Sequence, residues 1–154
     1  LQREYHTTDP QLLISANETT LPGKVADVSF TSKLLRSLYA CPNGIYRMSP
    51  DIPGLVQTSN NLARVMFGKG ECQVQCLSRS SVDSEKTDLS LAITSAFELC
   101  GAEVKLAGGY PGWTPNPSSP VVKLMTETYR RLFNEEARVS AVHAGLECGI
   151  LGRN

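Results

Sequence analysis

The sequence lacks an excess of either charge, and it lacks a long apolar run. Its 154 residues include fifteen Lys and Arg and fifteen Asp and Glu, so the formal net charge at pH 7 is zero. No run of neighbouring basic residues is longer than Arg130-Arg131, whereas nucleic-acid-binding domains present a basic patch. No apolar run approaches the ~20 residues of a membrane span. These absences predict a protein with no nucleic-acid partner and no membrane partner.

The usual disulfide and metal-binding patterns are also absent. The five cysteines, an odd number with no C-x-x-C pair, are Cys41, Cys72, Cys76, Cys100 and Cys148. Such cysteines are typical of small buried side chains in a reducing compartment, so we expect a cytoplasmic location. A zinc site is the alternative, but the sequence has only two histidines and no suitable ligand spacing.

The length suits one domain, which would bury roughly two thirds of the surface of its unfolded chain. Both ends are abrupt, because residues 1–5 read like the tail of a helix and residues 151–154 stop just after an apolar segment. We therefore expect the chain to be a piece of a longer protein.

Apolar periodicity predicts an α+β fold, an antiparallel sheet with helices packed on one face as a two-layer sandwich. Predicted strands cover residues 11–18, 44–48, 55–67, 71–79, 102–107 and 139–142. Predicted helices run from Asp27 or Ser29 to about Tyr39, from Asp83 or Ser84 to Cys100, and from Ser118 or Ser119 to about Phe133. The turn at 68–70 is expected to join two strands in a hairpin, and Gly101 to end the second helix.

The same periodicity predicts which side chains are buried. The expected helical stripes are Phe30, Leu34, Leu38 and Cys41, then Leu89, Ile93, Ala96, Phe97 and Cys100, then Val121, Met125, Thr128 and Leu132. In the strand 71–79, Cys72, Val74 and Cys76 share the apolar face. Arg79 therefore points to the opposite face.

A loop rich in Gly and Pro, residues 108–117, interrupts the pattern. We expect a boundary there, with residues 1–108 as one domain and residues 114–154 as part of another. The helix from 118 and the strand from 139 are then expected to pack away from the sheet.

Residues 142–149 place ionisable side chains beside glycines, which allow close approach of a ligand or a second domain. The alternative is a strand end that leads into a helix. His143 and Cys148 could form a nucleophile pair, although the apolar neighbours of Cys148 indicate a packed thiol. Glu147 follows His143 by four residues, the spacing of a metal-binding or acid/base pair on a helix. Gly145 weakens such a helix, and two ligands are too few for a catalytic zinc.

Arg79 ends a strand on the open face, and its guanidinium can hold a carboxylate through two parallel hydrogen bonds. A solvated surface arginine is the alternative. Asn60-Asn61 is interpreted as structural, because such side chains satisfy backbone groups at a bulge.

Several motifs resemble the bacterial aminoacyl-histidine dipeptidases of the M20 metallopeptidase group, the PepD type. The motifs are Pro42-Asn43-Gly44, Val56-x-Thr58-Ser59-x-Asn61, Cys76-Leu77-x-Arg79-Ser80, Gly109-Tyr110-Pro111-Gly112-Trp113-x-Pro115, Glu127-Thr128-Tyr129-x-x-Leu132-Phe133-Asn134 and His143-Ala144-Gly145-Leu146-Glu147-Cys148-Gly149. The resemblance covers roughly residues 40–151.

This resemblance implies a cytosolic homodimer with a two-zinc catalytic domain and an inserted α+β lid that usually forms the dimer interface. Residues 1 to about 108 would be the later part of the lid, and residues from about 114 a helix-strand piece of the α/β catalytic domain. The implied reaction is hydrolysis of Xaa-His (carnosine-like) dipeptides by a metal-bridging hydroxide. The family's metal-binding motifs lie outside these residues, so we expect no metal ligand, no catalytic residue and no activity in this chain alone.

For the substrate, the resemblance implies that Arg79 holds the carboxylate, and it places His143 and Glu147 near the cleft. Glu147 would pair with the substrate amino group. Two other functions stay open: a non-catalytic α+β module for self-association, and a small-molecule-binding domain that uses Arg79.

Overall fold

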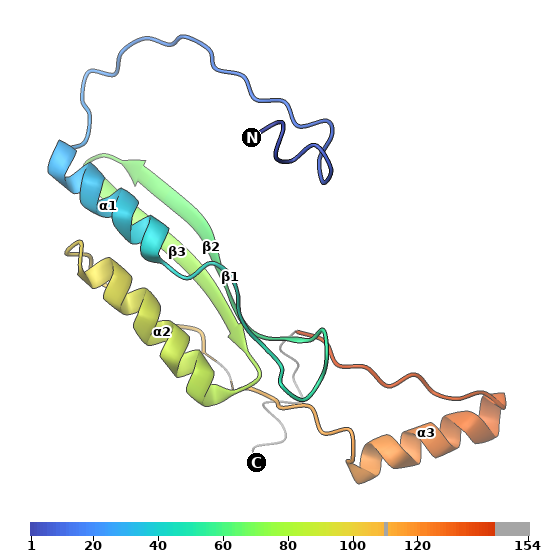
Figure 1. Ribbon diagram of the computed structural model, residues 1–154. Coiled ribbons are helices and arrows are strands. Elements are labelled where there is room, and N and C mark those ends of the chain that lie inside the picture. The colour runs from blue at the N-terminus through green and yellow to red at the C-terminus, as the bar shows by residue number, and fades with distance from the viewer. Residues whose placement is uncertain (110, 144–154) are drawn as a thin grey trace.

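A three-stranded antiparallel sheet forms the centre of the protein (Figure 1). The computed structural model describes residues 1–109 and 111–143. In chain order the elements are α1 (Val28–Ala40), β1 (Gly44–Met48), β2 (Val56–Gly68), β3 (Glu71–Ser80), α2 (Asp83–Glu98) and α3 (Pro120–Phe133). The strands lie in the order β1-β2-β3.

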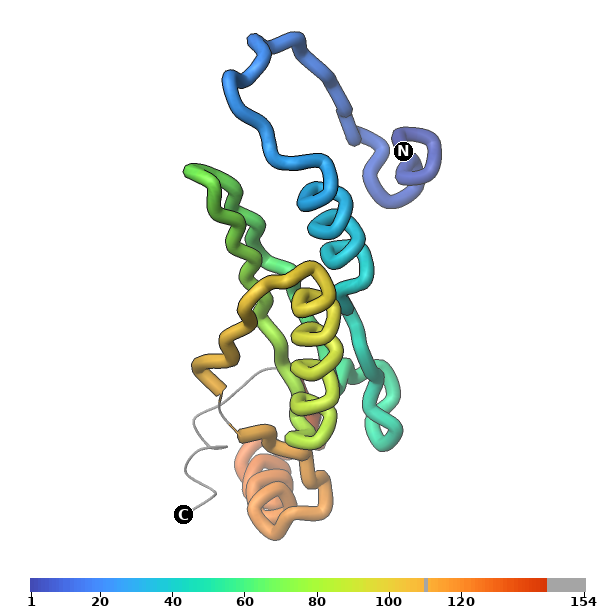
Figure 2. The backbone as a smooth tube through the Cα atoms, turned by 90° about the vertical axis from the view of Figure 1, so that its left-hand side faces the viewer, coloured from blue at the N-terminus to red at the C-terminus, as the bar shows by residue number. Residues whose placement is uncertain are grey.

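Helices α1 and α2 lie next to each other over one face of the sheet (Figure 2). The core between these layers contains Cys41, Leu89, Ile93 and Phe97, against which Leu38, Tyr46, Leu62, Val74, Cys76, Cys100 and Val104 pack. The predicted α+β class with an antiparallel sheet is therefore confirmed. The predicted stripe of α2 is confirmed as well, with Cys100 only half-buried.

The predicted hairpin forms between β2 and β3. Lys69 and Gly70 both have positive φ, 55° and 84°, as the tight two-residue hairpin turn requires. The pairing extends from Gly68 opposite Glu71, at the turn, to Thr58 opposite Ser80, with an irregularity between Leu62 and Arg64. Side chains of β3 alternate between half-buried and exposed, so the two predicted faces of this strand are confirmed.

The predicted side-chain caps at the N-termini of α1 and α2 have different outcomes. Asp27 caps α1, because its Oδ1 accepts a hydrogen bond of 3.0 Å from the backbone N–H of Phe30. The predicted side-chain cap of α2 is wrong, since the cap residue is Val82. The N–H of Val82 instead donates to Ser80 Oγ at 3.1 Å. Gly101 follows α2 with φ 83°, which confirms the predicted glycine end.

Three predicted strands, 11–18, 102–107 and 139–142, are absent from the described residues. A strand needs a neighbour to satisfy its backbone N–H and C=O groups, and none of these segments has one. Residues 102–107 line the same groove as β3 without pairing to it. Apolar patterning predicted extended backbone, but pairing decides whether it becomes a strand.

Helix α3 extends away from the sheet (Figure 1). Its predicted buried stripe is wrong, since Val121, Met125 and Leu132 are 64–66% exposed and α3 contains no buried residue. Cys41, which caps the end of α1, is buried as predicted, whereas Phe30 within the helix is 38% exposed. No helix among the described residues is long and apolar enough to cross a bilayer. The domain boundary near residues 108–117 stays a prediction.

Candidate functional site

A polar cluster lies on the open face of the sheet, near the end of the β2–β3 pair. Ser59 in β2 is the direct partner of Arg79 in β3. His143 follows Ser59 by 84 residues, yet its Nε2 lies 2.7 Å from Ser59 Oγ. The three side chains line one open cavity of about 530 Å³, which we call the Arg79 cavity. Its other lining residues are Asn43, Gly44, Ile45, Val56, Asn60, Asn61 and Leu77.

His143 is held as a neutral imidazole. Partial burial lowers its pKa, and the positive charge of Arg79 lowers the pKa further. A hydrogen bond to the backbone of Val56 opposes both effects without cancelling them. At neutral pH the Arg79 cavity therefore has one fixed positive charge, on Arg79, beside an uncharged ring.

On the opposite face of the sheet, hydrogen bonds connect β2 and β3 to α2. Thr58 is wholly buried, and its hydroxyl bonds to Ser80 Oγ at 2.8 Å and to Glu85 Oε2 at 2.5 Å. Burial raises the pKa of Glu85, but hydrogen bonds from Thr58 and Gln57 and the charge of Arg47 give a net lowering. Glu85 therefore stays ionised and ties both strands to the first turn of α2.

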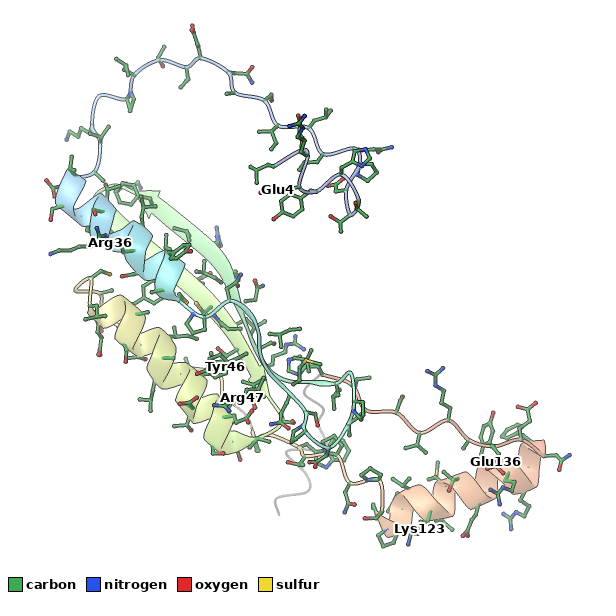
Figure 3. All side chains as sticks on the ribbon, in the orientation of Figure 1. Glu4, Arg36, Tyr46, Arg47, Lys123 and Glu136 are labelled. Atoms are coloured by element: carbon green, nitrogen blue, oxygen red, sulfur yellow. The ribbon has the colours of Figure 1, made fainter. Side chains whose placement is uncertain are left out.

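Strand β1 adds two side chains to this contact. Tyr46 and Arg47 lie beside α2 (Figure 3). Tyr46 Oη donates to Asp88 Oδ2 at 3.0 Å, and Arg47 lies 3.5 Å from the same carboxylate and 3.6 Å from Glu85. All three strands are thus connected to one helix, which limits movement of the sheet under the Arg79 cavity.

Asn60 has the structural role that the sequence predicted. It is 3% exposed, its Nδ2 donates to the backbone carbonyl of Pro42 at 2.7 Å, and its Oδ1 accepts from Ser78 Oγ at 3.0 Å. Asn43 similarly accepts a hydrogen bond from the N–H of Leu62 at 2.9 Å. These bonds hold the α1–β1 connection against β2.

The glycine-rich loop docks close to the site. The N–H of Gly112 donates to Asp83 Oδ1 at 3.0 Å, and Thr114 Oγ1 donates to the carbonyl of Ser81 at 3.2 Å. A Cβ at position 112 would lie 2.5 Å from that carbonyl oxygen, too close for any side chain. The second glycine of the Gly109–Trp113 motif therefore permits contact with the chain two residues after Arg79.

The structure brings together two of the three predicted substrate-binding residues, Arg79 and His143. Glu147, and with it Cys148, lies outside the described residues. Ser59 was missed as a site residue by sequence reasoning. Its signal was its place in the Val56-x-Thr58-Ser59-x-Asn61 motif, but among the polar residues of this strand only Asn60-Asn61 was interpreted, and as structural.

The described residues do not supply a zinc site, because they contain no group of three or more His, Cys, Asp or Glu able to hold a metal ion. The ionisable groups that line the Arg79 cavity are Arg79 and His143. The Arg79 cavity therefore offers hydrogen-bond donors and a positive charge, which suit a carboxylate.

No family model matches the chain. Over 116 residues it is 42% identical to the cytosol non-specific dipeptidase of Escherichia coli (strain K12), a match that covers 75% of this chain and 24% of that protein. The crystal structure of aminoacylhistidine dipeptidase from Vibrio alginolyticus matches with a TM-score of 0.90 and 29% identity, covering 99% of this chain and 31% of that one. The chain thus spans about a quarter to a third of these relatives.

Proposed function

The chain is homologous to part of the aminoacylhistidine and cytosol non-specific dipeptidases, and on this premise we propose that it belongs to a hydrolase that cleaves unsubstituted dipeptides, Xaa-His dipeptides among them. Within that enzyme, Arg79 holds the substrate carboxylate. The observation that supports this role is the convergence of Arg79, Ser59 and His143 on one cavity at a strand end.

Arg79 suits this role in charge and position. It is exposed on the face that the helices leave open, and the cavity that it lines contains no acidic side chain among the described residues. A hydrogen bond to a charged group contributes about 1.5–3 kcal/mol. A bidentate contact would also fix the direction in which a dipeptide lies.

The remaining roles in the complete enzyme are proposals that follow from the homology. Zinc ions would be held by residues beyond those the structure describes, so no catalytic step is assigned to this chain. Glu147 is proposed to pair with the substrate amino group, and the enzyme is proposed to act in the cytosol. His143 is proposed to contact the substrate beside Arg79.

Self-association is the second candidate function, and the proposed homodimer would use it. Strand β1 is an edge strand of the sheet, and Ile45 on it is 62% exposed. Unpaired strand edges favour contact with a second chain. A lid that dimerises and a lid that grips substrate are compatible roles for the same sheet.

The test is Arg79→Gln in the complete dipeptidase, with Arg64→Gln as the matched control. Arg64 is also an exposed arginine of the sheet, but it does not line the Arg79 cavity. We expect Arg79→Gln to lower kcat/KM for dipeptides by the equivalent of about 2 kcal/mol, close to thirtyfold. Equal values for the two variants would make Arg79 an ordinary surface charge.

A further inference from the structure

We propose that binding of a carboxylate at Arg79 is coupled to uptake of one proton by His143, and that Ser59 holds the imidazole in both of its charge states. The inference rests on the proposed carboxylate site and describes how pH regulates it. The proton comes from solvent, and the carboxylate stays ionised.

The hydrogen bonds around His143 permit this change of charge. The bond to the Val56 backbone raises the pKa of His143, which means that the ring donates to the Val56 carbonyl. In the neutral imidazole, Nε2 then accepts from the Ser59 hydroxyl 2.7 Å away. A serine hydroxyl can donate or accept. After protonation it accepts from Nε2–H, so neither contact of the ring is lost.

The charges around His143 provide the coupling. Arg79 is the one charged group of the described residues that acts on the imidazole, and it opposes protonation. The larger groove that His143 also lines contains Lys86, Glu103 and Lys105 as further charged residues. An anion held by Arg79 offsets its charge and adds an attraction of its own, so protonation of His143 becomes easier.

Linkage makes the effect reciprocal: if the carboxylate favours the protonated ring, the protonated ring favours the carboxylate. Affinity for a carboxylate should therefore rise as pH falls through the titration range of His143. Ser59 sits directly opposite Arg79 across the β2–β3 pair, close enough to keep the ring beside the bound anion. We therefore assign Ser59 as a positioning residue.

The experiment is an NMR titration of the 154-residue chain, in which His143 and His6 are the only imidazoles. Glycylglycine serves as the probe and glycylglycinamide, which lacks the carboxylate, as its matched control. We expect glycylglycine to move the titration midpoint of His143 to higher pH and to leave His6 unchanged. The amide should move neither. Arg79→Gln should abolish the shift, and Arg64→Gln should retain it.

Ser59→Ala should reduce the shift while glycylglycine still binds, and Ser59→Thr, which keeps a hydroxyl, should restore it. If glycylglycine perturbs resonances around Arg79 but leaves the His143 midpoint in place, the coupling is wrong and the carboxylate site stands. If glycylglycine causes no change in the spectrum that depends on Arg79, as tested with Arg79→Gln, the carboxylate site and the coupling are both wrong.

Discussion

Ser59 faces Arg79 because of one extra residue in β2. Between the turn and the pair formed by Arg64 and Gln75, β2 and β3 keep one register. From the pair formed by Leu62 and Cys76 onward, the register is shifted by one residue. Without this bulge the turn would place Asn60, not Ser59, opposite Arg79. The face of Arg79 could be predicted from the period of two. A bulge was expected at Asn60-Asn61, whereas the register shifts between Leu62 and Arg64, a position that no residue type marks.

The lowered pKa of His143 predicts how its charge affects stability. The unfolded chain binds a proton at His143 near pH 6.5, whereas the folded chain does so only at lower pH. Below about pH 6.5 the unfolded state therefore holds more protons than the folded state. As the pH decreases, the free energy of unfolding decreases too, until the pH is below the folded-state pKa. Urea unfolding at several pH values measures this slope. His143→Gln should flatten it, and an equal slope in this variant and in the unchanged chain would contradict the assignment.

Cys41 should be an unreactive thiol in the folded chain. Burial, with the neighbouring Cys76 as a smaller cause, raises the pKa of Cys41 to about 12. The thiolate is the nucleophilic form, so iodoacetamide near neutral pH should alkylate Cys41 far more slowly than half-buried Cys72. Peptide mass spectrometry over a time course measures both rates. Similar rates in the folded chain, not only in urea, would show that Cys41 is accessible.

At the scale of elements, the sequence predicted the turns and helix ends that depend only on residues close together in the chain. The β2–β3 hairpin, the cap of α1 at Asp27, the glycine end of α2 and the proline start of α3 are all present. The segment 102–107 failed as a strand because its pairing depends on what lies beside it. The α3 stripe failed for the same reason, since an amphipathic pattern does not show which surface will cover it.

The loop that carries Gly112 yields a prediction about one contact between elements. Gly112→Ala would place a Cβ 2.5 Å from the Ser81 carbonyl oxygen, whereas a Cβ at Gly109 would meet nothing within 4 Å. Relief of the clash requires movement of the loop or of the start of α2, at a cost of about 1–3 kcal/mol. Gly112→Ala should therefore lower the free energy of unfolding or expose residues 108–117 to proteolysis, and Gly109→Ala should do neither. Identical behaviour of the two variants would contradict the close approach.

At the scale of the molecule, the open arrangement agrees with that of a solved relative. A chain with α3 extended from the sheet matches a crystal structure with a TM-score of 0.90, although it spans only 31% of that longer chain. The same relative position of sheet and α3 therefore occurs within a longer chain. The exposed apolar side chains of α3 suit a surface that other residues cover, in line with the predicted division of the chain near residues 108–117.

Helix α3 should consequently be the less protected helix in the 154-residue chain. Leu89 and Phe97 anchor α2 in the core, at 0% and 6% exposure, whereas α3 has no buried residue. Isolated helices of this length are marginal in water, so amides of α3 should exchange with deuterium well before those of α2. In the complete dipeptidase α3 should gain protection while α2 stays as it is. Equal protection of both helices in the short chain would mean that α3 packs on a surface within this chain, which would remove the argument for a covering domain.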